Sequence, residues 1–158
     1  MNNTKQIRSE INPSDVAAYL IKLSIDIGEP LTNMKLQKLL YYAYSWYGVE
    51  KDTKLFEEEI MAWKYGPVIV SVYNMYREYG ADVIKEVKSG NTENIDTFTR
   101  SLIEEVFNVY GNKTAIELMN LAHSEGPWRD TYNPKILNTP IPFDSIREFY
   151  RARKEISD

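Results

Sequence analysis

Residues 32–48 read TNMKLQKLLYYAYSWYG and have the pattern of a helix that contacts neighbours on two sides. One side is apolar and consists of Leu36, Leu39, Leu40, Ala43 and Tyr47. The opposite side consists of Met34, Lys38, Tyr41, Tyr42 and Ser45. Because a helix that is apolar on one side and aromatic on the other usually packs against neighbours on both, we expect it to be central and the most heavily buried helix of the fold. Gly48 is expected to end it.

The neighbouring helices have recognisable start and stop signals. A helix is expected to start at Asn12-Pro13-Ser14-Asp15, where Asn can cap, Pro suits the first turn and Asp favours the helix dipole, and to end at Gly28. An apolar stripe over residues 98–109 predicts a helix ended by Gly111. Thr114 and Glu117 form a capping box for a helix that runs to about His123. Asp144 is expected to cap a final helix.

The segment between these helices predicts a small sheet. Residues 58–65 alternate between two sets of side chains, which is the period of a strand. Gly66-Pro67 is expected to open a helix over 67–79, and residues 83–87 are a second strand candidate that would pair with the first, in parallel or antiparallel. Residues 129–142 are expected to form an ordered loop. The predicted fold is therefore mostly α (α+β), a compact bundle of about six helices with one small two- or three-stranded sheet.

Composition limits the size of the fold and the classes of function. A chain of 158 residues suits one domain, which we expect to span residues 11–158 after a flexible N-terminus at 1–10. The absence of cysteine excludes disulfides and thiol chemistry. The net charge is −4 and evenly spread, so nucleic acid is an unlikely partner. No stretch resembles a targeting signal or a membrane span, and we expect a cytoplasmic protein.

Three blocks of the sequence resemble the Panacea domain, also called the SocA-like antitoxin family, which overlaps the phage-associated GepA-type proteins. The first block is residues 32–42, TNMKLQKLLYY. The second is LFEEEI at 55–60 followed by AWKYGPV at 62–68. The third is His123 with Gly126-Pro127-Trp128. The blocks are in family order and run across nearly the whole chain.

The resemblance implies a helical domain that neutralises a bacterial or prophage toxin by direct protein–protein binding. We therefore expect an antitoxin whose partner is a cognate protein toxin. Some members of the family act instead as adaptors that deliver a client to a bacterial protease. The alternative functions are therefore such an adaptor, or a phage protein that binds a host defence factor. Tyrosine, which makes up 12 of the 158 residues, is common at binding surfaces and agrees with this class.

The predicted partner-binding surface combines one side of helix 32–47 with the turn that follows residue 62. Its residues are Lys38, Tyr41, Tyr42, Trp63, Tyr65, Gly66 and Pro67. A cation beside aromatic rings is a recurring binding device, although a helical lysine can equally cover apolar surface with its stem. The Gly-Pro pair can be an ordinary helix start or an anion site. The family-motif positions expected to be structural are Leu36, Leu39, Leu40, His123, Pro127 and Trp128.

Catalysis is not expected. His123 is the only side chain suited to acid–base chemistry near neutral pH, and the sequence places no nucleophile or carboxylate beside it. A single histidine excludes a zinc site with two or three imidazoles. Glu57-Glu58-Glu59 would point to alternate faces of a strand, which is poor geometry for one ion. We therefore predict no enzyme activity, no metal and no cofactor.

Overall fold

The computed structural model describes residues 10–157. The predicted flexible segment 1–10 thus lies, except for Glu10, outside the described residues. The elements in chain order are α1 (Pro13–Ile27), α2 (Asn33–Lys51), β1 (Ile60–Trp63), β2 (Gly66–Val68), α3 (Val70–Met75), η2 (Arg77–Tyr79), η3 (Thr92–Asn94), α4 (Thr97–Tyr110), α5 (Ala115–Ser124), α6 (Gly126–Arg129), β3 (Pro140–Ile141) and α7 (Phe143–Ser157). The predicted class, mostly α with one small sheet, is confirmed.

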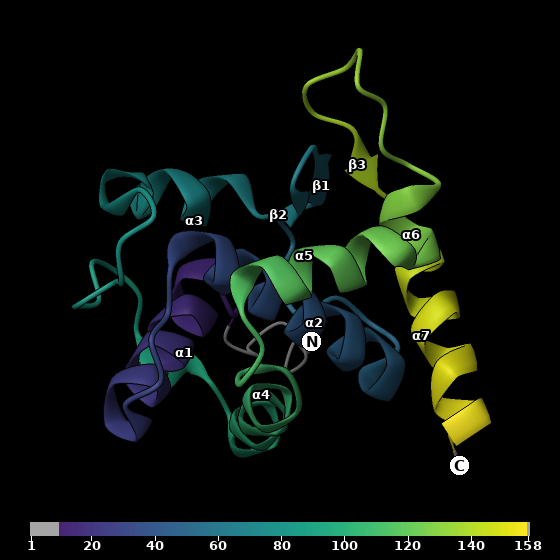
Figure 1. Cartoon of the computed structure of the whole chain (residues 1–158). Helices are drawn as coiled ribbons and strands as arrows, with labels where there is room; N and C mark the ends of the chain where they lie inside the picture. The colour runs from purple at the N-terminus through teal and green to yellow at the C-terminus, as the bar shows by residue number, and fades with distance from the viewer. Residues whose placement is uncertain (1–9, 158) are drawn as a thin grey trace, which may run out of the picture.

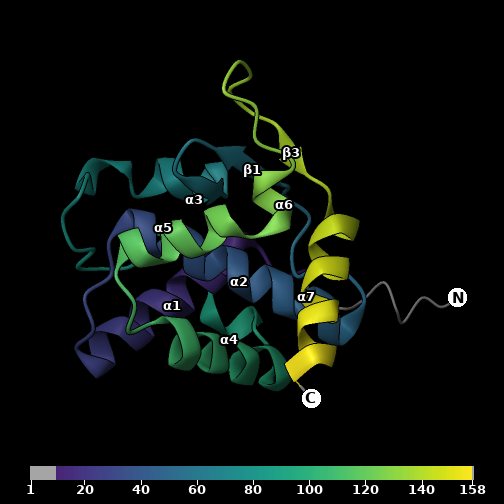
Figure 2. The same cartoon turned by 45° about the vertical axis from the view of Figure 1, so that its right-hand side comes forward.

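Helix α2 lies at the centre of the molecule, as its sequence predicts. It contacts α1, α4, α5, α7 and the β1–β2 hairpin, which surround it in Figures 1 and 2. The Thr32 hydroxyl caps its start by accepting a hydrogen bond from the Lys35 N–H at 3.3 Å. Fourteen of its nineteen residues are buried, so both of its sides are used for packing.

The predicted end of this helix at Gly48 is wrong, because α2 continues to Lys51 and ends at Asp52, whose φ is 59°. Gly48 is instead needed because helix α7 packs closely against it. A Cβ built on it would lie 2.8 Å from Cε1 and 3.2 Å from Cζ of Phe143, the first residue of α7. The missing side chain therefore lets the start of α7 approach the last turns of α2.

We predict that Gly48→Ala destabilises the fold by about 1–2 kcal/mol, because overpacking against the Phe143 ring outweighs the roughly 1 kcal/mol gain in helix propensity. Urea unfolding measures the change. The double variant Gly48→Ala/Phe143→Leu should recover most of the loss, since the smaller side chain makes room for the new methyl group. A single variant more stable than the wild type would contradict this explanation.

The sheet differs from the predicted one. Its strand order is β2-β1-β3 and both pairs are antiparallel, with Trp63 opposite Gly66 and Met61 opposite Pro140. Gly66-Pro67 belongs to β2 and does not open a helix, because Gly66 has a φ of +114° and closes a tight hairpin back onto β1. The helix starts only at Val70 and is short.

The predicted second strand over 83–87 is also wrong. Ile84 is buried, and its N–H donates a single hydrogen bond to the Leu31 carbonyl at 2.8 Å outside any strand. The third strand comes from Pro140 and Ile141, at the end of the predicted loop. In α7, which begins at Phe143, Asp144 lies in the first turn and is not the cap.

The other helix predictions are confirmed: α1 ends before Gly28, whose φ is +83°, α4 ends before Gly111, and α5 begins with the Thr114–Glu117 capping box. Among residues 10–157, no helix has the length and apolar character needed to cross a bilayer.

Candidate functional site

The tyrosine side of α2 lies in the interior. Tyr41 and Tyr42 are fully buried and Lys38 is 1% exposed. These three side chains therefore form no surface that a partner can contact, and this part of the predicted binding surface is corrected. The physical reason is that α5 and α7 pack over this side, and the hairpin covers Lys38.

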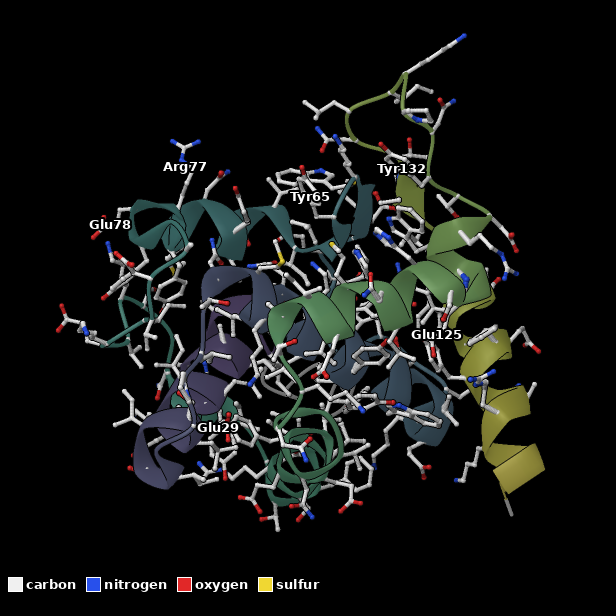
Figure 3. The ribbon with its side chains drawn as sticks, viewed as in Figure 1. Glu29, Tyr65, Arg77, Glu78, Glu125 and Tyr132 are labelled. Carbon is white, nitrogen blue, oxygen red and sulfur yellow. The ribbon has the colours of Figure 1, made fainter. Side chains whose placement is uncertain are left out.

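Tyr41 and Tyr42 belong to a cluster built around Glu125, which is 5% exposed and lies at the junction of α5 and α6 (Figure 3). One Glu125 oxygen, Oε1, accepts hydrogen bonds from the Tyr42 hydroxyl at 2.9 Å and the Tyr150 hydroxyl at 2.6 Å. The hydroxyls of Tyr150 and Tyr41 are 3.0 Å apart. Tyr110 stacks on Tyr42 with ring centroids 4.1 Å apart. We call Glu125 with these four tyrosines the tyrosine cluster.

The tyrosine cluster has raised pKa values, which keep its phenols neutral. Burial raises the pKa of Glu125, and the two tyrosine hydrogen bonds oppose this rise. Burial also raises the pKa of Tyr42 and Tyr150, and the nearby Glu125 carboxylate adds to the effect. The cluster therefore links α2, α4, α5 and α7 through neutral phenols around one acceptor, which suits a structural role.

Lys38 lies beneath the β1–β2 hairpin with little to neutralise it. Among residues 10–157 its ammonium group reaches only the Pro67 carbonyl, at 3.5 Å. A Cβ on Gly66 would lie 2.5 Å from Lys38 Cε. Gly66 and Pro67 are themselves buried. Burial lowers the pKa of Lys38 to about 7. The hairpin thus packs directly on the lysine stem, and Gly66 is required for this approach.

His123 stacks on Trp128, with ring centroids 3.9 Å apart and an interplanar angle of 15°. Its Nε2 is buried with no hydrogen-bond partner among the described residues. Burial and the charge of Lys38 lower the pKa of His123. Trp128 in turn stacks on Tyr132 and donates from Nε1 to the Trp63 carbonyl at 2.7 Å. This stack joins α5 and α6 to the sheet.

The remaining part of the predicted surface lies at the hairpin turn. Tyr65 is 53% exposed, and the Lys64 ammonium lies 5.5 Å from its ring centroid. Trp63 is half-buried and donates from Nε1 to Asn138 Oδ1 at 2.7 Å. Of the seven predicted partner-binding residues, the structure therefore places only Tyr65 and part of Trp63 at the surface.

Sequence reasoning missed two surfaces. The first is the projecting loop, residues 130–139, which rises from the body in Figures 1 and 2 and exposes Ile136 and Leu137. The signal in the sequence was their position in the proline-containing segment 129–142, which was expected to form an ordered loop. The second is an open groove of about 400 Å³ between α2 and α4, lined mainly by Trp46, Phe98, Leu102 and Val109.

Within residues 10–157, no group of three or more His, Cys, Asp or Glu side chains is arranged to hold a metal ion. Most buried polar side chains bond to one another inside the fold. The tyrosine cluster is one example, and Gln37 is another, because its Nε2 donates to Asn33 Oδ1 at 3.0 Å.

Together these elements define a small, mainly helical domain organised around one buried helix. Residues 36–129 match the family model described as antitoxin SocA-like, Panacea domain. Since the match covers more than half of the chain, this protein belongs to the SocA-like Panacea domain family.

The chain is also 32% identical over 124 residues to the protein named antitoxin SocA of Caulobacter vibrioides, strain NA1000 / CB15N. The matched region covers 72% of this chain and 66% of that relative, just under two thirds of its length. No solved structure matches the chain.

Proposed function

We propose that this chain is an antitoxin that neutralises a cognate protein toxin by direct binding in the bacterial cytoplasm. The observation that carries the proposal is the family membership, together with the identity to a relative whose name is antitoxin SocA. The exposed apolar side chains outside the core support a binding role.

The proposal contains no catalytic step. His123 has its ring stacked on Trp128, its Nε2 buried and its pKa lowered, which supports a structural part for this residue. A general acid–base group needs access to the proton that it transfers, and this nitrogen has none.

Co-expression tests the proposal. The gene beside this one is induced in a host whose growth it arrests, with and without this chain. We expect growth to recover only when the chain is present, and the two proteins to purify together. Failure of both would contradict the proposal.

A second measurement separates neutralisation by binding from delivery to a protease. The half-life of the toxin is followed after translation is blocked. Direct neutralisation predicts a toxin that persists in the complex at an unchanged or longer half-life. A half-life that shortens only in the presence of this chain would favour the adaptor function.

A further inference from the structure

The projecting loop and the hairpin turn lie at the same end of the sheet. Strand β1 pairs with β3 so that Ile60 lies opposite Ile141 and Met61 opposite Pro140. Continuing this antiparallel register brings Trp63 beside Asn138, and the two side chains form a hydrogen bond of 2.7 Å. Trp63 also lies opposite Gly66, across the turn that carries Lys64 and Tyr65. The loop therefore emerges next to this turn (Figures 1 and 3).

The loop is held in one shape although it projects from the body. The Thr139 carbonyl accepts from the Ala62 N–H at 2.8 Å, which extends the strand pairing into the loop. Asn133 organises the turn before the tip, because its side-chain oxygen accepts from the Lys135 N–H at 2.9 Å and its carbonyl from the Ile136 N–H at 3.0 Å. The Tyr132 ring stacks on Trp128 at 4.8 Å. A braced loop loses little conformational entropy on binding.

The tip of this loop exposes apolar side chains to water. Leu137 is 76% exposed and Ile136 is 51% exposed, and Leu137 is the most exposed large apolar side chain of the described residues. Exposed apolar side chains on a projecting loop have no packing function within their own chain, whereas burial of such a pair against a partner is favourable. We call Ile136 and Leu137 the apolar tip.

The charges around the apolar tip are mainly positive. Lys64 and Lys135 form no ion pair with a carboxylate of the described residues, whereas Arg129 lies 3.4 Å from Asp130. The chain as a whole has a charge of −4, so this end differs in sign from the rest of the molecule. A partner with acidic residues around an apolar pocket complements this surface.

We propose that the apolar tip, together with Tyr65 and Lys135, is the surface that holds the toxin, and that the toxin offers an apolar pocket bordered by acidic side chains. This inference rests on the proposed antitoxin function and adds where on the chain the toxin binds. The family model ends at residue 129, immediately before the loop. The apolar tip and Lys135 thus lie beyond the part that the family model matches, where an element specific for one partner is expected, whereas Tyr65 lies within it.

Two loop variants and one matched control test the location. Ile136→Asp and Leu137→Asp should each bind the toxin of the neighbouring gene at least tenfold more weakly and lose growth rescue, because a charged group enters the apolar pocket. The control is Ile116→Asp, which changes an apolar side chain on α5 whose 63% exposure lies between those of Ile136 and Leu137. It should bind and rescue like the wild type. Thermal unfolding of all three should match the wild type, since none of these side chains is buried.

Charge reversal gives an independent readout. Lys135→Glu should slow association with the toxin several-fold at low salt, and the difference from the wild type should shrink at high salt because the interaction is screened. An association rate that is unchanged at low salt would contradict the acidic border of the pocket.

The remaining outcomes decide between this inference and the function on which it rests. If the wild type fails to rescue growth, the antitoxin function and the binding surface both fall. If the wild type and both loop variants rescue equally, only the surface is wrong. Loss of rescue in Val109→Asp alone, in the groove between α2 and α4, would also overturn it and would place the toxin there. If Leu137→Asp changes the oligomeric state of the free protein in solution, the apolar tip serves self-association and the proposed toxin surface is wrong.

Discussion

Lys38→Met is expected to stabilise the isolated protein by about 3 to 5 kcal/mol at pH 7, because it removes an ammonium group that is buried with one long contact. Methionine has a similar length and keeps the packing under Gly66. Urea unfolding of the two proteins across a series of pH values measures the difference. A variant less stable than the wild type at pH 7 would contradict the account of Lys38 as an unneutralised buried cation.

The pH dependence of that difference follows from the lowered pKa. Burial lowers the pKa of Lys38 to about 7 from 10.5 in the unfolded chain. Between these values the unfolded chain holds the proton and the folded chain does not, so the wild type becomes more stable as the pH rises. The advantage of Lys38→Met should therefore shrink by about 3 kcal/mol between pH 7 and 9.5, at up to ~1.4 kcal/mol for each pH unit.

Other titrating groups are common to both proteins, and the difference between them therefore isolates Lys38. His123 is neutral over this window in both proteins, because burial, the larger cause, lowers its pKa from 6.5 also without Lys38. Leu39→Met is a suitable control, since it changes a buried side chain of the same helix without changing charge. Its offset from the wild type should be the same at every pH. A constant offset for Lys38→Met would show that the lysine keeps its proton in the fold.

Glu125→Ala is expected to destabilise the protein by about 2 to 4 kcal/mol, because two buried tyrosine hydroxyls lose their shared acceptor. Glu125→Gln keeps an acceptor oxygen without the buried charge and should lose only about 1 kcal/mol near neutral pH. Thermal and urea unfolding of both variants measure these values. Equal losses in the two variants would mean that the carboxylate itself is required and that a neutral acceptor oxygen cannot replace it.

Acidification should widen the difference in the free energy of unfolding between the wild type and Glu125→Gln. Burial raises the pKa of Glu125 in the folded chain above 4.5, so the folded chain binds the proton more tightly than the unfolded chain. The stabilisation from this group is complete below pH 4.5 and is lost as the pH rises through the folded pKa. The wild type should therefore gain stability relative to Glu125→Gln as the pH falls toward 4.5. A gap that stays constant over this range would contradict the raised pKa.

Local signals in the sequence predicted most of the helices. The Asn12-Pro13 start, the Thr114–Glu117 box and the two-sided pattern of residues 32–48 are each contained within a few turns, and the structure has helices at all three places. The signals failed where one residue type can have either of two structural roles. Gly48 is a common helix stop, yet here it makes room for Phe143, which is 95 residues away in the sequence.

The sheet and the binding surface depended on contacts that no local pattern contains. Gly66-Pro67 fits a helix start, and only its pairing with β1 shows that it belongs to a strand. Pro140 and Ile141 complete the sheet from a segment without strand periodicity. Tyr41 and Tyr42 were correctly placed on one side of α2. In the interior, however, the Tyr42 hydroxyl donates to Glu125 and the Tyr41 hydroxyl meets that of Tyr150, because α5 and α7 pack over them.

The central position of α2 has a consequence for how the domain opens. Since α1, α4, α5, α7 and the hairpin all contact this one helix, none of them can separate without exposing its apolar or aromatic side chains. The amide protons of its middle turns should therefore exchange with deuterium only through global unfolding, as a single cooperative unit. A protease that degrades this chain would accordingly have to unfold the whole domain, and could not trim it one helix at a time.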